Sequence, residues 1–240
     1  MKKPKHYIRP LLRKFGRDLI VYDHLHHPLA RRAKLISFNN IDVVIDIGAN
    51  RGQYARELRG AGYDGKIISF EPLSNAFVEL EQWSRNDGNS IAINKAVGDR
   101  DGEIEFNIAA NSTSSSVLDM LPAHTNAAPH SSIIGTEKVK ITRLDSIYEE
   151  FCPTGQKVLL KIDTQGYEMS VLEGSANSLV KVTALQLEMS FVRLYKGQVL
   201  FIEMLAYLEA RGFKLVDINP MFIHPQSGEV LQVDGFFVRS

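Results

Sequence analysis

The chain has 240 residues, 44% of them hydrophobic, which is enough to bury one sizeable core and fits a single α/β domain. The only cysteine, Cys152, excludes an intramolecular disulfide and a cysteine-rich zinc site, so we expect a reducing compartment, the cytoplasm. The zero formal net charge hides a division. Residues 1–40 hold ten Lys and Arg against two acids (+8), whereas residues 41–240 hold 18 against 26 (−8). No apolar run approaches the ~18 residues of a membrane span, and the start lacks the apolar stretch of a signal peptide.

The first forty residues predict a basic helical segment, separate from a domain over residues 41–240. Apolar residues recur there at helical spacing with cations between them, in the order Ile8, Arg9, Leu11, Leu12, Arg13, Lys14, Phe15, Arg17 and Leu19. We expect this helix to dock its apolar stripe on the domain, because most such stripes face a core. It could instead rest on an anionic membrane or attract an anionic substrate. His24, His26 and His27 follow, but they lack an acid or cysteine at a recognisable spacing, so we do not predict a metal site there.

Beyond residue 40, short apolar runs alternate with helical patterns. The runs are VVIDIGA, KIISFEP, SIAINKAV, KVLLKIDTQ, TALQLEMS, FKLVDIN and VDGFFVRS. Continuous apolar strands separated by helices predict a mostly parallel sheet with helices on both faces, a Rossmann-like α/β fold with seven strands. The last two runs are joined only by the turn-rich HPQSGE, so we expect them to form an antiparallel C-terminal hairpin.

One region breaks this alternation. EIEFNIAA and EKVKITRL both alternate as strands with no helix between them, and we expect them to extend or flank the sheet. The long Ser-, Pro- and Asn-rich connection between them covers residues 111–135, and loops of that length in compact domains are usually either functional or disordered.

The stretch VVIDIGANRGQYARELRGAG resembles a nucleotide-binding turn without its usual spacing. Gly48 and Gly52 do not form G-x-G-x-x-G, and Asp46 would repel a pyrophosphate. S-adenosylmethionine carries a sulfonium and an amino group instead, so the acid favours that ligand, which we expect to satisfy Asp46. Glu71, 19 residues beyond Gly52, can accept both hydroxyls of a ribose, although NAD-binding folds also place an acid there.

At this point the residues resemble the FkbM-type methyltransferases, which are class I S-adenosylmethionine-dependent enzymes. The resemblance rests on VVIDIGANRGQYA, SFEP, NKAVGDRDGEIEF, SSS, LKIDTQGYEMSVLEGS, LQLEMSF, LYKGQ, GFKL and DGFFVR, in family order over residues 42–240. It implies a methyltransferase domain over residues 41–240 and transfer of a methyl group to oxygen, often a hydroxyl of a sugar, a glycosylated lipid or another natural product. The alternatives are an NAD(P)-dependent oxidoreductase and a non-catalytic module that retains the cofactor fold.

The predicted cofactor residues lie on and after the first three strands: Asp46, Gly48, Asn50, Gly52, Tyr54, Glu71, Pro72, Asn94, Ala96 and Val97. Tyr54 could bond the cofactor carboxylate or pack under the first helix, and Trp83 is expected to pack. Ser114 to Ser116 could bond cofactor or substrate, and Tyr195 and Lys196 could line an acceptor pocket.

Asp163 is the predicted catalytic base or acceptor-orienting group, because it ends the strand LLKID at the ligand edge of the sheet. Glu168 and Glu188 are further catalytic candidates, and His130 and His224 are alternative bases. These carboxylates could together bind a divalent metal, but carboxylates without a tighter motif are a weak signal for a metal site, so we do not predict one. We expect a small-molecule or glycan hydroxyl acceptor and no nucleic acid, and the sequence leaves homo-oligomerisation open.

Overall fold

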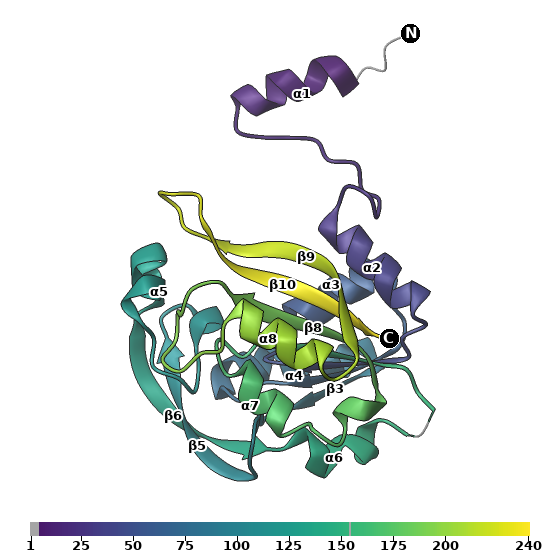
Figure 1. Cartoon of the computed structure of the whole chain (residues 1–240), viewed down its shortest axis with the longest axis vertical. Coiled ribbons are helices and arrows are strands. Elements are labelled where there is room, and N and C mark those ends of the chain that lie inside the picture. The colour runs from purple at the N-terminus through teal and green to yellow at the C-terminus, as the bar shows by residue number, and fades with distance from the viewer. Residues whose placement is uncertain (1–4, 154) are drawn as a thin grey trace.

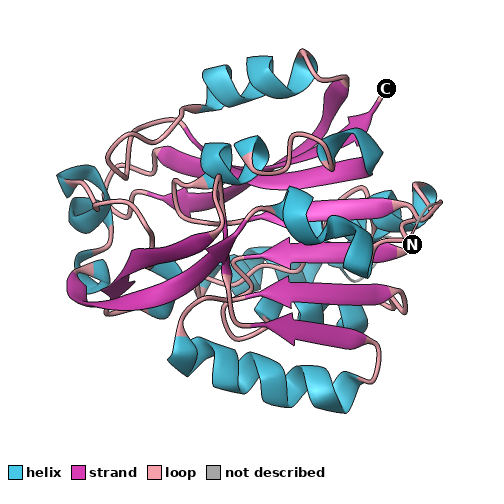
Figure 2. Ribbon diagram, turned by 90° about the horizontal axis from the view of Figure 1, so that it is seen from below, coloured by secondary structure: helices cyan, strands magenta, loops and turns pink. Residues whose placement is uncertain are grey.

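The computed structural model describes residues 5–153 and 155–240, and its centre is a seven-stranded sheet (Figures 1 and 2). The strand order is β3-β2-β1-β7-β8-β10-β9. The strands are β1 (Val43–Ile47), β2 (Lys66–Phe70), β3 (Ser90–Ile93), β7 (Val158–Ile162), β8 (Val182–Ser190), β9 (Phe213–Ile223) and β10 (Val230–Arg239). Neighbours from β3 to β8 are parallel, and β10 runs antiparallel to both β8 and β9. The predicted fold class is therefore confirmed, including the C-terminal hairpin.

Helices cover both faces of this sheet. On one face, α2 (Pro28–Phe38) and α3 (Gln53–Gly60) bury Ile36 and Leu58 against β1 and β7. On the other face lie α6 (Leu144–Phe151), α7 (Glu168–Glu173) and α8 (Phe201–Glu209), with Leu172 and Leu208 in the larger core. The remaining helices are α4 (Ser74–Asp87) beside β3, α5 (Pro122–Ala127) and α1 (Lys5–Lys14). Every residue of β1 and β7 is buried, as expected for parallel strands covered on both faces.

A second sheet, of three strands, flanks the first. It has the order β4-β6-β5 and is built from β4 (Ala96–Val97), β5 (Gly102–Ala109) and β6 (Ile133–Thr142). SIAINKAV is therefore not one strand, because β3 ends at Ile93 and β4 pairs with β6 instead. The side chain of Asn94 marks the break by donating to the carbonyl oxygens of Glu71 and Pro72 at 3.0 and 2.9 Å.

The two N-terminal helices differ in their contact with the rest of the molecule. Figure 1 shows α1 held away from the body, and its Leu11 and the following Phe15 are 57% and 75% exposed. The expected docking of this apolar stripe on the domain is therefore not observed. By contrast, α2 packs through the buried Ile36, and Arg31 Nε lies 2.8 Å from Asp217 Oδ1 of β9. The domain boundary at residue 40 stays a prediction. Within the described residues, no helix combines the length and apolar character that a bilayer crossing needs.

Candidate active site

A cavity of about 280 Å³ opens at the carboxyl ends of β1, β2 and β7, the edge where parallel α/β sheets bind ligands. The predicted residues that line it are Gly48, Asn50, Tyr54, Glu71, Pro72, Ala96, Val97, Ser115 and Asp163. Its remaining polar walls come from several elements: Arg32, Gln53, Glu57, Lys95, Ser112, Thr113, Lys161, Thr164, Gln165, Tyr167, Gln186 and Asp234. The fold thus gathers most of the predicted site at one place.

The turn after β1 requires glycine for a reason internal to the fold. Gly48 has a φ of 81°, and a Cβ atom built on it would lie 1.9 Å from the carbonyl oxygen of Asp163. Its backbone therefore approaches β7 more closely than any side chain allows. Gly52 has a φ of 82°, does not line the cavity, and lies where a Cβ would press on Leu80. The close approach holds Gly48, which lines the cavity, against the end of β7.

Glu71 joins the turn to the second strand. Its Oε2 accepts the Asn50 amide at 2.8 Å, and its Oε1 accepts the Leu73 amide at 2.9 Å. A carboxylate has about four acceptor positions, so each oxygen retains one for a ligand hydroxyl. Glu71 lines the cavity, and burial raises its pKa to about 7, against the opposing effect of the two amides. The site therefore fits a ribose that donates two hydroxyls, as predicted from the sequence.

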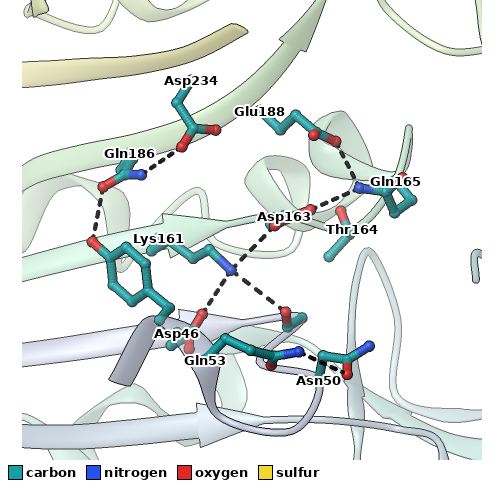
Figure 3. Close-up of polar contacts among 12 residues, drawn as sticks. Asp46, Asn50, Gln53, Lys161, Asp163, Thr164, Gln165, Gln186, Glu188 and Asp234 are labelled. Atoms are coloured by element: carbon teal, nitrogen blue, oxygen red, sulfur yellow. Dashed lines mark hydrogen bonds and ion pairs between the residues drawn. The ribbon is translucent and has the colours of Figure 1, made fainter. Parts of the chain in front are cut away.

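Asp46 faces away from the cavity, toward a buried cation. It is fully buried, and its Oδ1 lies 2.9 Å from Lys161 Nζ, which also approaches Asp163 Oδ2 at 3.4 Å (Figure 3). Burial disfavours the charge on Lys161, but Asp46 and Asp163 outweigh it and hold the Lys161 pKa above its ordinary value. The acid that we expected a ligand to satisfy is therefore paired with a lysine, although neither Asp46 oxygen accepts a hydrogen bond from the described residues. Lys161, unlike Asp46, lines the cavity.

Asp163 presents its carboxylate to the cavity from the end of β7. It exposes 37% of its side chain, and Gln165 Nε2 donates to its Oδ1 at 2.9 Å. The same amide donates to Glu188 Oε2 at 2.7 Å, so one glutamine bridges the two carboxylates (Figure 3). Glu188 also accepts from Gln232 and lies outside the cavity wall, and burial together with neighbouring acids raises its pKa. Of the two, Asp163 is the carboxylate within reach of a ligand.

Gln165 holds this arrangement in an unusual backbone conformation. Its φ of 55° lies in the left-handed region, which non-glycine residues adopt at a cost of about 1–3 kcal/mol. Tyr195 donates to its Oε1 at 2.9 Å, and Ser116 donates to its carbonyl oxygen at 2.8 Å. Glu168, buried at the start of α7, accepts from the backbone amides of Thr164 and Gly166 and so stabilises the same turn. The surrounding contacts determine the position of the amide that supports Asp163.

A second polar chain crosses the sheet beside the cavity. Tyr54 donates its hydroxyl to Gln186 Oε1 at 2.8 Å, and Gln186 Nε2 donates to Asp234 Oδ2 at 2.9 Å (Figure 3). Burial and the charge of Asp163 raise the pKa of Asp234 to about 6. In the sheet register, Asp234 of β10 lies opposite Glu188 of β8. The residue before Glu188, Leu187, pairs with Ile162 at the end of β7. A carboxylate that the sequence analysis did not select thus shares the cavity with Asp163.

The other predicted residues lie outside the cavity wall. Tyr195 is fully buried, and its hydroxyl also lies 3.0 Å from the carbonyl oxygen of Ser114, whereas Lys196 is exposed near Asp119. His130 is exposed, and His224 accepts amides in the β9–β10 turn. Asn94, Glu168, Ser114 and Ser116 also lie outside the wall, and Asn94 donates to backbone carbonyl oxygens. Among the described residues, no three His, Cys, Asp or Glu side chains are placed to hold a metal ion.

The principal residues missed from the sequence are Lys161, Gln165, Gln186 and Asp234. A visible pattern accompanied three of them. Lys161, Gln186 and Asp234 are polar residues inside otherwise apolar strands, VLLKI, ALQLE and VDGFF. Polar groups at such positions are costly unless they are paired, so they indicate a buried network.

Comparison with known families agrees with this geometry. A family model described as the methyltransferase FkbM domain matches residues 46–215, which is more than half of the chain. The chain belongs to the FkbM methyltransferase family. The predicted resemblance is confirmed, and the match favours a methyltransferase over the NAD(P)-dependent alternative. No curated protein sequence matches the chain.

Solved structures show the fold of S-adenosylmethionine-dependent methyltransferases. The FkbM methyltransferase from Methylobacillus flagellatus KT is similar with a TM-score of 0.52 and 12% identity, over 82% of this chain and 44% of that chain. This FkbM chain therefore spans less than half the length of that relative. Aeropyrum pernix fibrillarin, solved with natively bound S-adenosyl-L-methionine, has a TM-score of 0.46 and 11% identity, over 82% of this chain and 66% of that chain. An rRNA methylase from Streptococcus thermophilus has a TM-score of 0.44 and 12% identity, over 89% and 96% respectively.

The pKa of Glu71 predicts how cofactor affinity of this FkbM protein changes with pH. Ribose hydroxyls donate best to the ionised carboxylate, so affinity for S-adenosylhomocysteine should be constant well above pH 7, where Glu71 is charged. Below that pH it should fall by up to roughly tenfold per unit as Glu71 becomes protonated. Titration calorimetry across this range checks the result, with Glu71→Gln expected to bind more weakly and to lose the pH dependence. Equal affinity of the wild type at all these pH values would contradict the assignment of Glu71.

Proposed function

We propose that this protein transfers a methyl group from S-adenosylmethionine to a hydroxyl oxygen of a sugar, a glycosylated lipid or another natural product. The observation that carries the proposal is the position of Asp163, whose carboxylate faces the cavity beside the glycine turn and Glu71. The cavity thus joins a place for a ribose to a place for a proton acceptor. Lys161 and Gln165 contact the two oxygens of Asp163 and hold it in one orientation.

Methyl transfer to a hydroxyl requires the protein to position the two reactants and to supply one general base. S-adenosylmethionine supplies an electrophilic methyl, so the acceptor oxygen forms the new C–O bond while the S–C bond breaks and S-adenosylhomocysteine leaves. Asp163 takes the proton of the acceptor hydroxyl. Without this transfer, the methylated oxygen would keep the proton and carry a positive charge. Positioning of the two reactants can contribute ~7–11 kcal/mol, and a general base ~10²–10⁴ in rate. Glu188 and Glu168 then support the site through Gln165 and its turn.

The polar wall around Asp163 supports a hydroxylated acceptor rather than a nucleic acid. The acids of the cavity wall are Glu57, Glu71, Asp163 and Asp234, and its cations are Arg32, Lys95 and Lys161. Arg32 Nη2 lies 2.7 Å from Glu57, and Lys161 pairs with Asp46. Asp234 has no cation at ion-pair distance among the described residues, so a phosphate beside it would be repelled, whereas a hydroxyl can donate to its Oδ1. Gln186 and Gln53 add amide partners for a polyol.

The direct test is methyl transfer to separated cell fractions. The purified protein is incubated with S-adenosylmethionine carrying a tritiated methyl group and, in turn, with glycans, lipids and RNA from the source organism. We expect label in the glycan or lipid fraction, in a methyl ether that survives alkali. Label confined to RNA, or recovered only as an alkali-labile ester, would contradict the proposed acceptor class while leaving methyl transfer itself intact.

A further inference from the structure

The C-terminal half of α1 and the chain that follows it, residues 9–25, combine exposed apolar side chains with cations. Seven large apolar residues within residues 9–25 are exposed: Leu11, Phe15, Leu19, Ile20, Val21, Tyr22 and Leu25. The cations are Arg9, Arg13, Lys14 and Arg17, all of them exposed. A folded protein rarely leaves so many neighbouring apolar side chains in water unless the surface binds something. We name residues 9–25 the N-terminal surface.

The N-terminal surface has an internal structure of its own. Leu11 lies in the last turn of α1, and Phe15 follows the helix directly, in a turn where its amide donates to the carbonyl oxygen of Leu12 at 2.9 Å. Asp18 accepts from the guanidinium groups of Arg9 and Arg13, at 2.9 and 3.0 Å at closest, which ties the chain after α1 back to the helix. These contacts keep the apolar and cationic groups together, although Figure 1 shows α1 apart from the body.

The N-terminal surface is continuous with the wall of the active site. It leads directly into α2, which is fixed to the body by the buried Ile36 and by the Arg31–Asp217 ion pair. The next residue of α2, Arg32, lies over the ring of Tyr54, with 4.5 Å from its Cζ to the ring centroid, and both side chains line the cavity. The N-terminal surface is therefore joined through α2 to one side of the cavity wall.

We infer that the N-terminal surface docks on an anionic lipid bilayer. Leucine and aromatic side chains that enter the interface, flanked by cations that meet anionic headgroups, form the pattern of an interfacial helix. Residues 1–40 carry ten cations and two acids, which complements an anionic surface and makes two copies of this segment repel each other. Docking would bring the cavity close to the bilayer. The inference does not depend on the identity of the methyl acceptor.

Vesicle co-sedimentation of the full chain tests the inference. One set of vesicles is phosphatidylcholine alone, and the other is an equal mixture of phosphatidylcholine and phosphatidylglycerol. We expect the wild type to sediment with the mixed vesicles and to be released by high salt. Lys14→Gln with Arg17→Gln should weaken partitioning roughly tenfold or more, because each cation near an anionic surface contributes to binding. Leu11→Glu with Phe15→Glu should abolish it.

The matched control is Val180→Glu with Ile202→Glu, which adds the same two negative charges at exposed apolar residues outside the N-terminal surface. It should sediment as the wild type does. The inference is overturned if the wild type ignores the mixed vesicles, or if the control loses as much binding as the Leu11/Phe15 variant. It is also overturned if the wild type does not bind vesicles and sedimentation velocity shows that it is a dimer, whereas the Leu11/Phe15 variant is a monomer. The N-terminal surface would then bind a second copy of the chain.

Discussion

Replacement of Asp163 by Asn is expected to lower turnover by ~10²–10⁴, the range usually contributed by a general base. Asn keeps the size of the side chain and one oxygen that Gln165 can still bond, but it cannot take the proton of the acceptor hydroxyl. Affinity for S-adenosylhomocysteine should change little, because the contacts that recognise the ribose come from Glu71. Single-turnover kinetics and calorimetry on the same preparation separate the two effects.

Glu188→Gln is the comparison variant for this experiment. Glu188 is bonded by two glutamine amides and lies outside the cavity wall, so its replacement should cost much less turnover than Asp163→Asn. If Asp163→Asn retains near-wild-type turnover, Asp163 is not the base. If Glu188→Gln has the larger effect, Glu188 and not Asp163 accepts the proton.

Asp46→Ala is expected to destabilise the fold by about 3–5 kcal/mol, because it leaves Lys161 as a buried cation without its closest partner. The sequence alone predicted a different outcome, since an acid satisfied by a ligand would lose binding rather than stability. The complete burial of Asp46 reverses that order. Urea denaturation without any ligand measures the change, with a lower midpoint and an unchanged slope as the expected result.

The double variant Asp46→Ala/Lys161→Met shows whether the buried pair is the cause. Removal of both charges leaves no uncompensated ion, so the double variant should recover much of the stability that Asp46→Ala loses. Should the double variant be as unstable as the sum of its single variants, the loss would arise from packing and not from the ion pair.

The sequence predicted the fold well because its strands are covered on both faces. Runs such as VVIDI and VLLKI are continuous and apolar, and they become the fully buried β1 and β7. The short link between the last two runs leaves room only for a hairpin, and β9 and β10 form one. SIAINKAV was wrong as a single strand, since its first half pairs with β2 and its second half pairs with β6 in the other sheet. Such long-range pairing is invisible to local patterns.

In the candidate site too, the sequence predicts what the strand pattern determines but not the contacts between distant segments. Gly48, Glu71 and Asp163 follow the ends of three neighbouring parallel strands, β1, β2 and β7, so the topology alone brings them to one edge. The partners of these residues come from distant segments. Lys161 reaches Asp46 across a strand pair, and Gln165 is placed by Tyr195 and by Ser116 in the long connection over residues 111–135. Periodicity does not encode which side chain a buried acid will meet.

The central claim is that the cavity between the glycine turn, Glu71 and Asp163 binds S-adenosylmethionine. Titration calorimetry of the full chain with S-adenosylhomocysteine and, separately, with NAD⁺ and NADP⁺ tests it most directly. We predict saturable binding of S-adenosylhomocysteine that Glu71→Gln weakens, and no comparable binding of either dinucleotide. Tight dinucleotide binding with no response to S-adenosylhomocysteine would contradict the account.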